Sequence, residues 1–213
     1  MAKTGNKNKS IKDAVIDAAL ELAAEQPWGD VEFYTIIGKS GITKADALEY
    51  FDDKADVLVA YGRRLDRQLA DEVGEPSVNE PHRDRLFDVL MERFDLINND
   101  REAVISILRS IKFDPKQGLM TFPHLTKSMG RVLDLSGIDT DGVRGCIKIT
   151  ALTGIYLYTV KTWKGDDSPD MGKTMACLDR SLGMAEEFAN SFDDKDIGGL
   201  FSSVKNIFKK DDA

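Results

Sequence analysis

The residue types that most often perform chemistry in proteins are few in this chain and widely spaced. It has two histidines, His82 and His124, and two cysteines, Cys146 and Cys177. None of the four falls in a metal-ligand or catalytic spacing such as HExxH or CxxC. No GxGxxG or GxxxxGK[ST] segment is present to cradle a nucleotide, and the acids of "LMERF" and "EEFAN" lack the Glu-x-x-His pairs of a di-iron bundle. We therefore expect a protein that is not an enzyme and that holds no cofactor and no metal.

The composition indicates a globular protein, and its two widely spaced cysteines favour a reducing compartment. Hydrophobic residues make up 42% and charged residues 31% of the chain, which argues against global disorder. The net charge of −8 gives no overall electrostatic footprint for nucleic acid, although a local basic patch could still serve. The first residues lack the apolar core of a signal peptide, and no apolar run approaches ~20 residues. The sequence thus predicts a cytoplasmic protein.

Apolar residues recur at helical spacing almost throughout, and no segment has a strand-turn-strand pattern. The pattern predicts an all-α protein of about nine or ten helices. We expect a basic flexible tail (1–9), a head with its connecting helix (10–72), a helical bundle (83–192) and an amphipathic C-terminal helix (196–210). Ser10 and Ser168 are expected to cap helices, and residues 112–125, which contain two prolines, to be irregular.

The head contains the stretch "GITKADALEYFDDKADVL" (41–58), whose spacing of turn and apolar residues is typical of a helix-turn-helix. Together with an amphipathic first helix and a short second one, it makes residues 11–62 resemble the DNA-binding domain of the TetR family of transcriptional regulators. The spacing lets Gly41 adopt a left-handed turn and lets Leu48 and Phe51 anchor the following helix. In this reading, the positions that would face DNA are Thr43, Lys44, Asp46, Glu49, Tyr50 and Lys54.

The chemistry of these positions departs from that of the TetR family. Between Lys44 and Asp56 there are five acids and only two lysines. Asp46 stands where the family has a small hydroxylated residue, Leu48 where it has a phosphate-contacting Tyr, and Glu49 where a base is common. Carboxylates repel phosphates, although a single acid can read the cytosine N4 amino group in the major groove. We therefore expect a retained scaffold in which DNA binding is disfavoured.

The C-terminal half carries a second resemblance. The string "IYLYTVKTWKGDDSPDMGKTMACLDRSLGMAE" (155–186) resembles the signature of the accessory lipid-binding family of ubiquinone (coenzyme Q) biosynthesis, and residues 85–108 are similar to the segment that opens its bundle. The resemblance implies a TetR-type fold that binds an isoprenoid or phospholipid without catalysis. Considered alone, the string has a structural explanation, with Ser168 as a helix cap and Asp166 and Asp167 in the loop before it.

Methionine and aromatic side chains of the bundle suit an adaptable cavity for a hydrophobic ligand, although residues at this spacing are also typical of plain core. The candidate ligand-binding residues are Phe113, Met120, Phe122, Met129, Leu133, Ile149, Leu152, Tyr156, Met175, Leu178 and Leu182. Helices 142–164 and 168–190 are expected to supply a homodimer interface.

The final segment, "DIGGLFSSVKNIFKK", predicts a basic amphipathic helix. Its apolar face could lie in the interface of the inner membrane, or pack on its own bundle or a partner helix. The residues of that face are Leu200, Phe201, Val204, Ile207 and Phe208. Two functions follow: a lipid-binding accessory of ubiquinone biosynthesis, or, as the alternative, a TetR-type DNA-binding repressor controlled by a small hydrophobic ligand.

Overall fold

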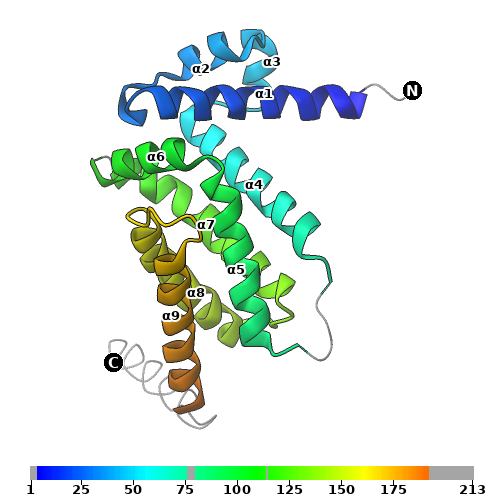
Figure 1. Cartoon of the computed structure of the whole chain (residues 1–213). Coiled ribbons are helices and arrows are strands. Elements are labelled where there is room, and N and C mark those ends of the chain that lie inside the picture. The colour runs from blue at the N-terminus through cyan, green and yellow to red at the C-terminus, as the bar shows by residue number, and fades with distance from the viewer. Residues whose placement is uncertain (1–3, 76–79, 114, 192–213) are drawn as a thin grey trace, which may run out of the picture. The chain divides into compact units, whose positions relative to one another are not determined.

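The computed structural model describes residues 4–75, 80–113 and 115–191 of the chain. All regular secondary structure in these ranges is helical, with nine α-helices and one short 3-10 helix (Figure 1). In order, they are α1 (Thr4–Glu25), η1 (Trp28–Asp30), α2 (Phe33–Ser40), α3 (Lys44–Leu48), α4 (Lys54–Val73), α5 (His82–Asn98), α6 (Arg101–Phe113), α7 (Pro115–Leu135), α8 (Gly142–Trp163) and α9 (Gly172–Ser191). The predicted all-α class is confirmed.

The chain forms two compact units, Met1–Gly154 and Ile155–Ala213, whose boundary falls inside α8. The first unit contains α1 to α7 and the first half of α8. The second contains the rest of α8 and α9. Within the described ranges, no helix combines the length and the apolar character needed to cross a bilayer.

The head is built by helices α1 to α4 around one small core. Helix α1 packs against α2, α3 and α4, and Ile36 and Ile37 of α2 are buried. Gly41 has φ 69°, in the left-handed region, so it ends α2 in the predicted turn. Phe51 is buried, but the prediction that Leu48 also anchors the helix is wrong, because Leu48 is 47% exposed and the small Ala47 takes the inward position.

The starts of three helices, α1, α7 and α9, differ from the sequence prediction. Helix α1 begins at Thr4, so Ser10 lies inside it and residues 4–9, expected to be part of a tail, are helical. Most of the stretch expected to be irregular belongs to α7, which starts at Pro115 and continues through Pro123. Proline is well tolerated at the first position of a helix, where its missing N–H has no intrahelical partner.

Helix α9 starts at Gly172, four residues later than expected, and Asp166 organises the loop that leads to it. Its buried carboxylate accepts hydrogen bonds from the backbone N–H and the hydroxyl of Thr174, both at 2.8 Å, and from the N–H and hydroxyl of Ser168. Burial raises the pKa of Asp166, but these donors outweigh it and hold the pKa well below its usual range. Asp166 thus lies in the connecting loop, as expected, and its hydrogen bonds fix the conformation of that loop.

A buried ionic cluster joins three helices of the first unit. Asp66, in the middle of α4, accepts from Arg93 of α5 at 2.9 Å and from Arg131 of α7 at 2.6 Å. The hydroxyl of Ser128, also on α7, donates to the same carboxylate. Arg93 is only 3% exposed, so its charge depends on Asp66 for compensation. The cluster therefore fixes α4, the last helix of the head, against α5 and α7.

The start of α8 requires a glycine. A Cβ atom at Gly145 would fall on the backbone carbonyl of Thr140, in the loop before the helix. Only a residue without a side chain allows the loop to approach α8 this closely.

Candidate nucleic-acid interface

Helix α3 presents a defined set of side chains to solvent. Thr43 caps it by accepting a hydrogen bond from the Asp46 N–H at 3.1 Å. Ala47 faces the core, whereas Lys44, Ala45, Leu48 and Glu49 are exposed. The structure therefore brings together, on one short helix and its ends, five of the six residues predicted to face DNA, of which Asp46 and Tyr50 are only partly exposed.

The sixth predicted residue, Lys54, has a structural role. Its ammonium donates to the backbone carbonyls of Trp28 and Val31, both at 3.1 Å, and lies 5.4 Å from the centroid of the Trp28 ring. It thereby ties the start of α4 to η1. A side chain that is engaged in this way contributes little to phosphate binding.

Other cations of the head are also engaged within the chain. Lys39 forms ion pairs with Glu25 at 2.9 Å and Glu21 at 3.3 Å, and its hydrogen bond to Glu25 is the main cause of its raised pKa. Lys12 lies over the ring of Tyr50, with its Nζ 4.9 Å from the centroid. Lys44 lies in the same way over Tyr34 at 5.1 Å. Since Lys12 and Lys44 are exposed, they are the head cations best able to reach a phosphate.

Three of the nearby acids serve the fold. The carboxylate of Asp53 accepts from the N–H groups of Ala55 and Asp56, so it caps α4 and occupies the helix end where an anion would bind. Asp56 in turn accepts from the Asp52 N–H at 2.8 Å. Asp46 lies in the first turn of α3, where the helix dipole favours a negative charge. Glu49 has no such role in the described contacts and is exposed.

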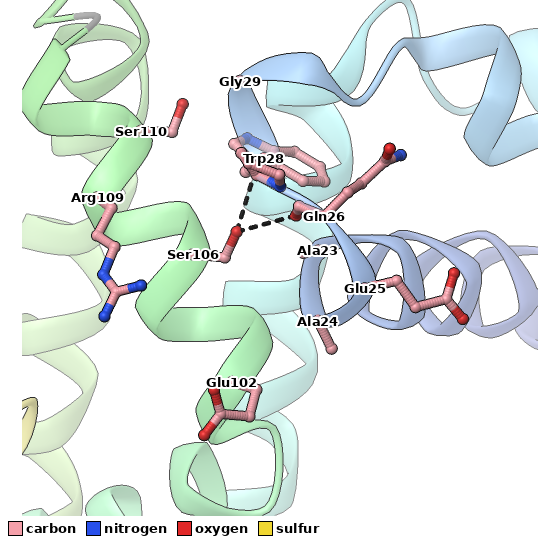
Figure 2. Close-up of a pocket in the computed structure, with 11 residues that line it drawn as sticks. Ala23, Ala24, Glu25, Gln26, Trp28, Gly29, Glu102, Ser106, Arg109 and Ser110 are labelled. Atoms are coloured by element: carbon pink, nitrogen blue, oxygen red, sulfur yellow. Dashed lines mark hydrogen bonds between the residues drawn. The ribbon is translucent and has the colours of Figure 1, made fainter.

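A hollow of about 520 Å³ lies where the end of α1 and η1 meet α6 (Figure 2). Ser106 of α6 closes this contact, because its hydroxyl accepts from the Trp28 N–H at 3.0 Å and donates to the Gln26 carbonyl at 3.2 Å (Figure 2). The Trp28 indole Nε1 is buried and has no hydrogen-bond partner in the described part of the chain. A second hollow, of about 440 Å³, borders the same two helices at Asp17, Glu21 and Asp100. These features show how α6 contacts the head.

Neither hollow includes a predicted ligand-binding residue. Six of those residues are buried as ordinary core: Met129, Leu133, Leu152, Tyr156, Leu178 and Leu182. Ile149 is half-buried, while Phe122 and Met175 are 46% and 41% exposed. The side chains of Phe113 and Met120, and the membrane residues predicted in 200–208, lie outside the described residues. No three potential ligands among the described His, Cys, Asp and Glu side chains gather to hold a metal ion.

Large apolar side chains are exposed along α8 and α9. On α8 they are Val143, Ile147, Leu157 and Tyr158, between 42% and 59% exposed, and on α9 Met175 and Met184. The three- and four-residue spacing on α8 places its members on one side of that helix, together with the exposed Thr150, Ala151 and Gly154. Exposed apolar surface of this extent on one helix is typical of an interface.

The geometry of the head and the order of the helices define a class of fold, that of TetR-family transcriptional regulators. A TetR regulator from Nitrosomonas europaea matches with a TM-score of 0.64 and 23% sequence identity, over 82% of this chain and 97% of the other. One from Rhodococcus sp. RHA1 has a TM-score of 0.59 and 15% identity, over 84% and 96%. A third, from Streptomyces coelicolor, has 0.56 and 18%, over 91% and 90%. No family model and no curated protein matches the sequence.

The chain therefore has a TetR-type fold, and the predicted fold class is confirmed. The resemblance to the ubiquinone accessory family has no counterpart among these matches. The sequence predicted the position of α3, but it did not single out Ala45 on the exposed side of this helix or Tyr34, whose ring lies beneath Lys44. Helical geometry carries the signal for Ala45, because Ala45 and the buried Ala47 lie on opposite sides of α3.

Proposed function

We propose that this protein is a DNA-binding transcriptional regulator whose head contacts the major groove through α3. The observation that carries the proposal is that one side of this helix is buried in the core and the other is exposed. Ala47 and Phe51 hold α3 against the core, Ala45 and Glu49 are left exposed on the opposite side, and Lys44 is exposed on its flank. An α-helix presented in this way fits the width of the major groove.

The charges of the head predict DNA binding that is weaker than a basic domain would give. The exposed acids Glu49 and Asp52 add repulsion, and Lys39 and Lys54 are engaged within the chain. Among the described lysine side chains of the head, Lys12 and Lys44 are exposed and can neutralise phosphates. Few neutralised phosphates mean few released counterions, so affinity should depend only modestly on salt.

We further propose that the exposed side of α8 is covered by a second copy of the chain. Six of the nine large apolar residues that are exposed in the described ranges lie on α8 or α9. A two-fold dimer buries the same surface of both copies and presents two heads to two half-sites of an operator. Replacing Ile147 by Glu should convert the dimer to a monomer in analytical ultracentrifugation, whereas Lys148→Glu, at the next position, should leave it dimeric. A monomeric wild-type protein at all concentrations would contradict the dimer.

The test of the proposed function is a gel-shift assay at low salt on DNA from around the protein's own gene. Lys44→Gln should weaken binding about 3- to 10-fold, since one phosphate contact is lost from each head. Lys127→Gln, which removes an exposed lysine from α7, is the matched control and should leave affinity unchanged. Equal losses in both variants would show that binding is non-specific and does not involve α3.

A second candidate is a lipid-binding accessory that works without DNA, as the resemblance to the ubiquinone family implies. The observation that favours it is the group of acids on and after α3. A small hydrophobic molecule, such as an isoprenoid or phospholipid, would then be the partner, with peripheral contact at the membrane. Native mass spectrometry after lipid extraction and liposome co-sedimentation with and without residues 196–213 test this candidate. A protein that carries no lipid and stays in the supernatant would exclude it.

A further inference from the structure

The side of α3 that points most directly away from the core carries a carboxylate. Successive residues of an α-helix are rotated by roughly 100°, so residues two positions before and after Ala47 lie about 160° from it on either side. These residues are Ala45 and Glu49, and both are exposed, whereas Ala47 is 0% exposed. Glu49 retains right-handed helical geometry, with φ −69° and ψ −19°, so it continues the face that Ala45 begins.

The other side chains of α3 occupy its flanks. By the same rotation, Lys44 and Leu48 lie on one side of this face and Asp46 on the other. Lys44 is held over Tyr34, and the Asp46 N–H is held by Thr43. These groups suit contacts with the walls of a groove. The side of α3 that points away from the core is therefore formed by Ala45, which has no polar side-chain atom, and by Glu49.

A carboxylate accepts hydrogen bonds and donates none when it is ionised. In the major groove, guanine presents two acceptors, N7 and O6, and thymine presents the acceptor O4, so all three atoms repel a carboxylate. Adenine places its acceptor N7 beside the N6 donor. Cytosine alone offers a donor, N4, and has no acceptor of its own in this groove.

We infer that Glu49 is a specificity-determining residue that selects a cytosine in each half-site of the operator. The inference rests on the proposed DNA-binding function and names the base that the head would read. The acid that weakens non-specific binding to phosphates thus gives sequence preference at one base pair. Glu49 suits this role better than Asp52 or Asp53, since it directly follows Leu48 and keeps right-handed helical geometry, whereas those two lie in the turn between α3 and α4 and Asp53 caps α4.

The experiment is a selection of bound duplexes from a random pool by the full-length protein, followed by sequencing, with the wild type and Glu49→Gln in parallel. The wild type should prefer cytosine at one position of each half-site by about 10-fold over other bases. Glutamine pairs with adenine through N6 and N7, so the variant should change that position from cytosine to adenine and leave the others unchanged. Asp71→Asn, an exposed acid of α4, is the matched control and should select the wild-type sequence.

Two outcomes overturn the inference in different ways. If both proteins enrich the same sequence, DNA is bound but Glu49 does not read it, and only this inference fails. If no duplex is enriched by the wild type or by either variant, the proposed DNA-binding function fails as well. Because Glu49 is exposed, the variant should fold normally, which its circular dichroism spectrum will check.

Discussion

Asp66→Asn should be among the most destabilising single substitutions in the chain. The change removes the negative charge that compensates Arg93, which is 3% exposed and 2.9 Å from the Asp66 carboxylate. An uncompensated buried charge costs about 3–5 kcal/mol. Arg131, whose side chain is 52% exposed, adds at most ~1 kcal/mol, and the Ser128 hydroxyl adds about 1 kcal/mol. The expected loss is therefore about 5 kcal/mol, a large part of the ~5–15 kcal/mol typical of a folded protein.

The assay is urea unfolding at one fixed protein concentration, with the slope m checked for constancy. Arg131→Gln is the control for the exposed partner and should cost no more than ~1 kcal/mol. The double variant Asp66→Leu, Arg93→Met removes both buried charges and should recover most of the loss. If Asp66→Asn lies within ~1 kcal/mol of the wild type, or if the double variant is no more stable than the single one, the cluster does not stabilise the fold as argued.

Three further predictions concern stability. Gly145→Ala should cost about 2–3 kcal/mol in urea unfolding, because its Cβ meets backbone, whereas Gly62→Ala, with open space around it in α4, should gain about 0.5–1 kcal/mol. Asp166→Asn should cost about 2–4 kcal/mol of unfolding free energy at pH 7. Folding lowers the pKa of this buried carboxyl, so its stabilisation is present above the unfolded pKa near 4 and is lost as pH falls further. The unfolding free energies of the variant and the wild type should therefore converge in acid. Lys54→Met should cost about 1–3 kcal/mol, measured in the same way, as two well-formed charged hydrogen bonds to η1 are lost; a cost below ~0.5 kcal/mol would show that this lysine does not hold the head together.

The sequence predicted the head because its signals are local. The spacing of Ile36, Ile37 and Phe51 and the glycine at position 41 specify two helices and a tight turn, and the structure has all of them. The inward residue of α3 was predicted less well. Leu48 is the more apolar side chain, but the close approach of α1 favours the small Ala47. Hydrophobicity alone does not contain that steric requirement.

The interactions that fix the rest of the fold have no local signal. The local sequence around Asp66 is typical of an ordinary amphipathic helix, and the partners of this acid, Arg93 and Arg131, are 27 and 65 residues away. Asp166 binds Thr174 across eight residues, and the Ser168 hydroxyl accepts from the Gly172 N–H, so the start of α9 is set by the folded loop and not by Ser168 as the residue immediately before the helix. Likewise, the methionines and aromatics of the bundle gave the same pattern for a cavity and for a core, which only packing distinguishes.

The most direct test of DNA recognition by α3 is fluorescence anisotropy of the full-length protein on its selected duplex, measured across a series of salt concentrations. If Lys12 and Lys44 are the cations of each head that contact phosphates, a dimer neutralises about four phosphates, and a plot of log K against log salt should have a slope of about −4. Glu49→Gln should lower affinity for that duplex and leave the slope unchanged, because it alters a base contact. No binding at ~50 mM salt, or a slope near zero, would contradict DNA recognition by α3 and would mean that this helix has only a structural role.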